Sequence, residues 1–220
     1  MKKLLFTLCL LGVFVFAAGA TALPVLQVDI SGGEYVGGTE QSTITGDTLF
    51  TLYALLTQDS PDFNKRYEMS VAVYAKIGFE DGLDPDAAFG TVDVDGAPLS
   101  FSNYGSPNFS ATPMELQEHG IFETYYGIFD VKFAAADTVG SYNVQDDSGA
   151  PGYSYYVGFN IDTTNLVDGT MIHFDLYDPA DGEPFAPFSH DAGTRVPEPG
   201  TLVLLGIGML GVAAFRRKLS

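Results

Sequence analysis

The sequence contains little cysteine, no tryptophan and few basic residues. Its 220 residues include one cysteine, three histidines and ten lysines and arginines, against 28 aspartates and glutamates. One cysteine cannot form a disulfide within the chain, so its core has to stabilise a folded body. The formal net charge of −18 argues against nucleic acid as a partner. The 17 phenylalanines and 12 tyrosines supply enough apolar surface for a packed core, which argues against disorder.

A long hydrophobic run near the C-terminus is also missing. The apolar segment 201–215 has no charged residue, but as a helix it would span only about 22 Å. That length is short of the roughly 30 Å hydrocarbon core of a bilayer. The basic residues Arg216, Arg217 and Lys218 follow it and, by the positive-inside tendency, keep the C-terminus in the cytoplasm. We therefore expect a short C-terminal apolar helix that contacts the membrane transiently.

The N-terminus has the pattern of a secretory signal peptide over residues 1–22. Lys2 and Lys3 precede an apolar stretch, and Ala20 and Ala22 supply small residues at the cleavage position. Cleavage there would remove Cys9, the single cysteine. Residues 23–196 would keep five basic and 27 acidic residues, which gives this part a formal charge of −22.

The tail combines three unlike parts in a fixed order. Val196, Pro197, Glu198 and Pro199 come first, the apolar segment 201–215 comes next, and the basic residues end it. The two prolines prevent a regular strand or helix from running through this point. The arrangement resembles the PEP-CTERM sorting signal. The resemblance implies a bacterial cell-envelope protein whose tail, 197–220, is recognised and removed by an exosortase, a membrane peptidase.

Between the two ends, hydrophobic residues mostly alternate with polar ones, which predicts half-buried strands. The clearest cases are 71–77, 129–133 and 172–176, with a hairpin at 91–102 and further strands at 25–30, 41–45, 48–56, 139–145 and 153–162. One short helix is expected after Thr112. We predict an all-β body at 23–178, a β-sandwich or jelly-roll-like domain. A linker at 179–196 is expected to follow it.

Four stretches of the body resemble the choice-of-anchor N group of bacterial surface proteins. They are Leu-Pro-Val-Leu-Gln-Val-Asp-Ile at 23–30, Phe-Thr-Leu-Tyr-Ala-Leu at 50–55, His-Gly-Ile-Phe-Glu-Thr-Tyr-Tyr at 119–126 and Phe-Ala-Pro-Phe-Ser-His-Asp-Ala at 185–192. Members of this group share a body and carry different C-terminal sorting signals. The resemblance implies a secreted or surface-displayed body, and it assigns no catalytic residue.

Two kinds of metal site can be considered. Calcium prefers six to eight oxygen ligands from acidic loops, and Asp175, Asp178, Asp181 and Glu183 form the best candidate set. Turn-forming aspartates in 81–86 and 93–95 are weaker candidates. His173 and Asp175 share one face of a strand at a spacing that suits two metal ligands. No second pair supports them, so an exposed polar face is the favoured interpretation.

No set of residues predicts catalysis. Ser189, His190 and Asp191 have the residue types of a triad, but adjacent residues do not converge as a triad requires, and a linker is expected there. Glu115, Glu118 and His119 lack the first histidine of a zinc-protease helix. Hydrolysis by paired carboxylates would need two acids converging in a groove, which a sequence cannot show.

Tyrosines are the remaining candidates for binding. Flat aromatic faces bind sugars, although strand tyrosines usually pack across strands. The six tyrosines concerned are Tyr125, Tyr126, Tyr153, Tyr155, Tyr156 and Tyr177. The sequence thus predicts a non-enzymatic protein of the cell surface or extracellular (biofilm) matrix. The alternative is a carbohydrate-binding module for extracellular polysaccharide, with a structural calcium ion.

Overall fold

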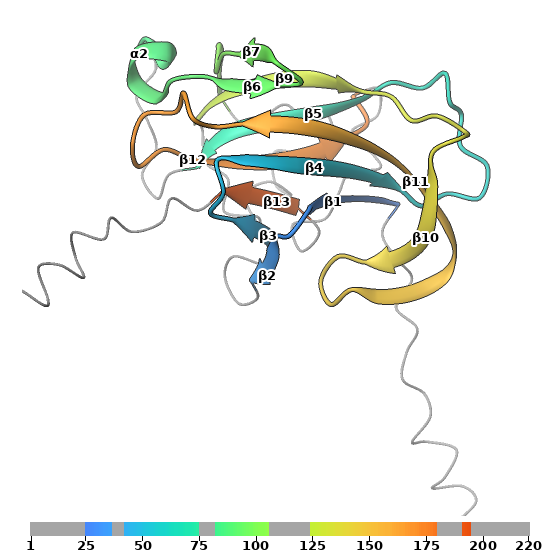
Figure 1. Ribbon diagram of the computed structural model, residues 1–220. Helices are drawn as coiled ribbons and strands as arrows, with labels where there is room; N and C mark the ends of the chain where they lie inside the picture. Colours follow the sequence, from blue (N-terminus) through green and yellow to red (C-terminus); the bar gives the residue numbers. More distant parts are fainter. Residues whose placement is uncertain (1–24, 37–41, 75–81, 106–123, 180–190, 195–220) are drawn as a thin grey trace, which may run out of the picture.

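The computed structural model describes residues 25–36, 42–74, 82–105, 124–179 and 191–194. These residues form strands in two sheets, with one short helix among them (Figure 1). The elements are β1 (Leu26–Ile30), β2 (Glu34–Val36), β3 (Ser42–Thr45), β4 (Leu49–Leu56), β5 (Tyr67–Tyr74), α2 (Pro85–Phe89), β6 (Val92–Val94), β7 (Ala97–Leu99), β8 (Asn103–Gly105), β9 (Thr124–Val131), β10 (Thr138–Asn143), β11 (Ser148–Asp162), β12 (Met171–Tyr177) and β13 (Asp191–Thr194).

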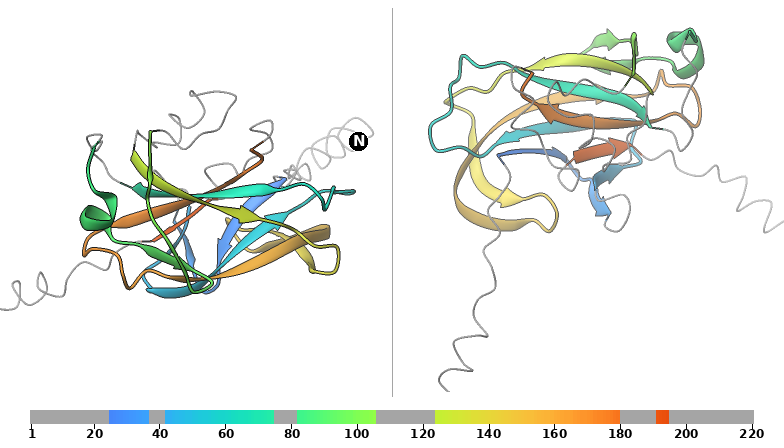
Figure 2. Two further views of the ribbon diagram at one scale, coloured as in Figure 1. Left: turned by 90° about the horizontal axis from the view of Figure 1, so that it is seen from above. Right: turned by 180° about the vertical axis from the view of Figure 1, so that it is seen from behind.

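The two sheets have different strand orders. The six-stranded sheet runs β1-β4-β11-β6-β7, with β10 paired to the first half of β11, and the seven-stranded sheet runs β2-β3-β13-β12-β5-β9-β8. Every described pairing of named strands is antiparallel except that of β13 with β3. The sheets lie in two layers (Figure 2). The all-β prediction is therefore confirmed, and the layers form a sandwich.

Aromatic and aliphatic side chains from both layers fill the space between the sheets. Phe50 of β4 and Phe174 of β12 meet edge to face across the layers, with ring centroids 6.1 Å apart. Phe129 of β9 and Phe159 of β11 form a second such pair at 4.9 Å. Edge-to-face packing of this kind adds to the free energy gained by burying the rings. The core thus supplies the stability that no disulfide can provide.

Several local predictions are confirmed. The run at 48–56 is strand β4, and the expected hairpin at 91–102 contains β6 and β7 joined by Asp95 and Gly96. Both turn residues have positive φ, 51° and 80°, which an Asp-Gly pair tolerates. The helix expected after Thr112 lies outside the described residues, as do the signal peptide and the tail. Within the described ranges, no helix is long and apolar enough to cross a bilayer.

Helix α2 was not predicted, although its signals are local. Asp84 precedes the helix and its carboxylate accepts a hydrogen bond from the Ala87 N–H, while Pro85 occupies the first helical position. Gly90 ends the helix with φ of 80° and forms an isolated bridge with Leu166. The helix lies at one corner of the sandwich, beside the β6–β7 hairpin (Figure 1).

Strand β13 corrects the predicted linker. Residues 191–194, inside the segment 179–196, pair in parallel with β3 and antiparallel with β12. Their first three residues are buried. The linker interpretation failed for these residues because their sequence, Asp-Ala-Gly-Thr, is poor in strand-forming residues and the pairing that orders them is long-range. The folded body therefore reaches Thr194.

Candidate metal centre

A buried polar cluster lies on the face of the seven-stranded sheet that points away from the core. Along β12, Ile172, Phe174 and Leu176 enter the core, so the alternate residues His173 and Asp175 point to the opposite face. Both are nonetheless buried, with exposures of 6% and 3%. The sequence-based interpretation of an exposed polar face is therefore wrong, because alternation of residue type reports the two faces of a strand and not what covers them.

Strand β13 adds a third residue to this cluster. His173 pairs with Gly193 and Phe174 with Ala192, so the next step of the antiparallel register sets Asp175 opposite Asp191. Asp191 is fully buried. Asp191 lies within the predicted linker, so the sequence does not place it in the cluster. It contacts residues of β12 that are sixteen to eighteen positions away along the chain, and no local pattern indicates such a contact.

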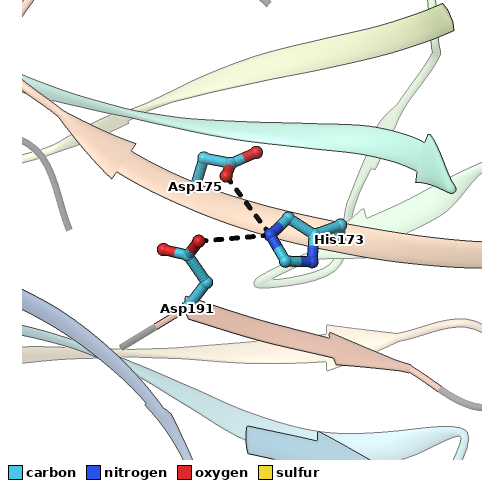
Figure 3. A group of neighbouring side chains, drawn as sticks. All are labelled: His173, Asp175 and Asp191. Atoms are coloured by element: carbon cyan, nitrogen blue, oxygen red, sulfur yellow. Dashed lines mark hydrogen bonds and ion pairs between the residues drawn. The ribbon is translucent and has the colours of Figure 1, made fainter. Parts of the chain in front are cut away.

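The three side chains converge on one ring nitrogen (Figure 3). The Nε2 atom of His173 lies 3.3 Å from an Asp175 carboxylate oxygen and 3.3 Å from an Asp191 carboxylate oxygen. One ligand atom from each residue lies within 4.8 Å of the other two. A nitrogen and two carboxylates at this spacing can either share protons or surround a metal ion.

The cluster also contains polar atoms that lack a partner. The second oxygens of Asp175 and Asp191 have no hydrogen-bond partner among the described residues, and neither does the Ser70 hydroxyl. Ser70 is fully buried on β5, directly opposite Asp175 in the register. Leaving a buried oxygen unpaired costs roughly 1–3 kcal/mol, and more for a charged group. The site is therefore incomplete with the described residues alone.

Protons compensate part of this buried charge. Burial by itself would lower the pKa of His173, but the charges and hydrogen bonds of Asp175 and Asp191 raise it above its ordinary value. Burial raises the pKa of the Asp191 carboxyl, and the charge of Asp175 adds to that shift. Both shifts favour the protonated forms of His173 and Asp191.

The predicted calcium set does not assemble in the described residues. Asp175 belongs to the histidine cluster, whereas the Asp178 carboxylate forms an ion pair with Lys65. Asp181 and Glu183 lie outside the described residues, so calcium binding by the full set remains a prediction. The carboxylates of Asp175 and Asp178 are engaged by different partners.

The other acidic clusters have local structural roles. Asp86 accepts a hydrogen bond from the Ser100 hydroxyl, and Asp95 accepts two from Asn160.

The residues with the types of a catalytic triad or a zinc-protease helix are mostly outside the described part of the chain. These residues are Ser189 and His190 of the triad-like set and Glu115, Glu118 and His119 of the other set.

Most of the candidate sugar-binding tyrosines are packing residues. Tyr125, Tyr126 and Tyr177 are buried, and the Tyr177 hydroxyl donates a hydrogen bond to Glu68. Tyr155 and Tyr156 are half-buried, each with its ring edge-on to another aromatic ring. Tyr153, 73% exposed, is the one of the six with a freely accessible face. The described tyrosines therefore do not form a shared flat platform.

A surface groove of about 440 Å³ lies on the six-stranded sheet. Asp93 and Asp162, which face each other across β6 and β11, line it together with Asn160. The Asp162 carboxylate accepts hydrogen bonds from the Thr164 hydroxyl and N–H, and these bonds lower the pKa of Asp162. A general acid needs a raised carboxyl pKa, so Asp162 is unsuited to that role.

Comparison with known proteins identifies the tail. Residues 195–218 match the PEP-CTERM protein-sorting motif, which indicates an exported protein with a C-terminal sorting tail of the kind that exosortase recognises. The match includes the predicted motif residues Val196, Pro197, Glu198 and Pro199 and the basic residues 216–218. No curated protein and no solved structure matches the chain. The resemblance of the body to the choice-of-anchor N group remains a prediction.

Proposed function

We propose that this chain is a non-enzymatic surface or extracellular-matrix protein that an exosortase sorts and cleaves through its tail. The observation that carries the proposal is the junction between body and tail. The last described strand ends at Thr194, and the sorting motif begins at residue 195. A packed sandwich therefore continues directly into a sorting signal.

The composition supports export followed by release from the membrane. The body has a strongly acidic formal charge, which keeps it solvated and disfavours adsorption to an anionic membrane surface. The apolar segment 201–215 is marginal as a lone permanent anchor because of its length. Membrane attachment through this segment would then precede processing, and the body would remain at the cell surface or in the matrix afterwards.

Cell fractionation with and without the host's exosortase tests this proposal. With the enzyme present, the mature protein should lack its tail and appear in the outer envelope or medium. Without the enzyme, the tail-intact form should accumulate in the inner membrane. Tail-intact protein in the inner membrane of both strains would contradict the proposal.

A variant of the sorting motif adds a second test to the same experiment. Glu198→Gln should reproduce the phenotype of the strain that lacks the enzyme, because it alters the acidic residue between the two prolines. Glu34→Gln is the matched control, since Glu34 is an exposed acid on β2. Normal processing of the Glu198 variant would show that this residue does not take part in recognition.

The groove on the six-stranded sheet favours a second candidate function, binding of extracellular polysaccharide. Aspartate and asparagine side chains bind sugar hydroxyls through hydrogen bonds, and Asp93, Asn160 and Asp162 line this groove. A glycan array probed with the exported protein, with and without calcium, tests it. Binding that Asn160→Ala weakens would support this function, and no binding in either condition would remove it.

A further inference from the structure

We infer that His173, Asp175 and Asp191 form a structural site for one divalent transition-metal ion of the Zn²⁺ type, which ties β13 to β12. The three residues come from two neighbouring strands and are all buried. The inference goes beyond the sorting function and does not depend on it. It also differs from the predicted calcium set, with which it shares only Asp175.

The distances suit such an ion. Zinc binds histidine nitrogen and carboxylate oxygen at about 2.0–2.2 Å, so two ligands at a tetrahedral angle lie about 3.4 Å apart. The Nε2 atom of His173 is 3.3 Å from each of the two carboxylate oxygens. The carboxylate oxygens lie within 4.8 Å of one another, a gap that small side-chain rotations can close.

Charge and hydrogen bonding favour a cation as the missing component. A metal ion binds neutral imidazole and ionised carboxylates, so the three ligands would then carry a double negative charge that a divalent ion balances fully. The second oxygens of Asp175 and Asp191, which have no partner in the described part of the chain, point away from the ring nitrogen (Figure 3), and an ion would satisfy them where a carboxylate binds it through both oxygens. Protons compensate part of this buried charge, and a divalent ion would compensate all of it; buried charge without compensation costs several kcal/mol.

The donor set indicates the class of metal. Calcium and magnesium prefer all-oxygen sites, with six to eight ligands for calcium, whereas imidazole suits zinc and the other first-row transition metals. The Ser70 hydroxyl, opposite Asp175 on β5, provides a further unpartnered oxygen on the same face. A catalytic metal needs access for a substrate, and the burial of all three ligands indicates a structural role instead.

Metal titration of the exported protein tests the inference. The protein is purified with or without its tail, stripped with a chelator and titrated with Zn²⁺, Mn²⁺ or Ca²⁺. We expect one Zn²⁺ per chain, a higher midpoint of thermal unfolding with Zn²⁺, and weaker Zn²⁺ binding in Asp175→Asn and Asp191→Asn by at least about 100-fold. Asp130→Asn is the matched control, because this exposed aspartate lies on the same sheet and pairs with Arg66.

Three results would overturn the inference. They are no Zn²⁺ binding, equal binding by the wild type and both aspartate variants, and binding of Ca²⁺ in place of Zn²⁺. If the variants fail to fold, Co²⁺-loaded wild-type protein provides an independent measurement by proton NMR. A paramagnetically shifted imidazole N–H signal that persists in a His119→Gln, His190→Gln double variant is expected. Its absence would equally overturn the inference.

Discussion

Strand β13 should be required for the body to fold, and two truncated forms test this. One form contains residues 23–194 and the other contains residues 23–190. Both lack the signal peptide and the sorting tail, and they differ only in the four residues of β13. The longer form is the matched control for the shorter one.

The expected loss of stability follows from the pairing of β13. This strand makes four register pairs with β3 and two with β12. At about one hydrogen bond per pair and roughly 1 kcal/mol net for each bond, the loss is on the order of 6 kcal/mol. The shorter form also separates β2 and β3 from the rest of their sheet. A domain of this size is stable by only about 5–15 kcal/mol, so the shorter form should be largely unfolded.

Urea unfolding followed by circular dichroism measures the difference. The 23–194 form should unfold in one cooperative transition. The 23–190 form should show no folded baseline, or a midpoint shifted far toward zero denaturant. If the free energies of unfolding of the two forms agree within about 1 kcal/mol, β13 contributes no more than an exposed edge segment would, and the reasoning is wrong.

Four further substitutions test local features of the body. Gly90→Ala should lower the free energy of unfolding by roughly 3 kcal/mol or more, because the added Cβ would overlap the backbone oxygen of Asn165. Gly96→Ala, with the same φ of 80° and open space around it, should cost only about 1 kcal/mol by the same urea assay. Burial raises the pKa of Asp29, so the wild type loses stability as pH rises through that raised pKa, whereas Asp29→Asn does not. The midpoint of thermal unfolding of the Asn variant, relative to that of the wild type, should therefore be higher at about pH 7 than at about pH 4. The same difference between the two midpoints at both pH values would contradict the explanation by a buried carboxyl. Arg66→Ala should change the free energy of unfolding by less than about 1 kcal/mol, because the arginine side chain is 60% exposed in both of its ion pairs.

Local sequence signals predicted the elements that depend on local interactions. β4 follows from an apolar run between turn residues, and the β6–β7 hairpin follows from alternation around Asp95 and Gly96. Helix α2 could have been found in the same way, since Asp84, Pro85 and Gly90 are standard signals for the start and end of a helix. These features depend on neighbours within a few residues.

The candidate metal centre depends on contacts that no local signal contains. The spacing of His173 and Asp175 indicates possible metal ligands, but their burial is a property of the tertiary structure. The proline and glycine residues and the few apolar runs of 179–196 predict a linker that includes Asp191, and Asp-Ala-Gly-Thr itself carries little signal for a strand. Its place in the sheet is set by β3 and β12, about 150 and 20 residues away along the chain. Long-range pairing of this kind has to be observed in the structure.

The position of β13 limits where the tail can be removed. Because β13 joins β3 to β12, cleavage before Asp191 would take away a central strand and one of the three clustered side chains. Cleavage after Thr194 leaves both in place. The sorting motif begins at residue 195, so an enzyme acting within the motif can remove the apolar segment without cutting the sheet. A metal ion between β12 and β13 would stabilise the body at the strand that directly precedes the sorting tail.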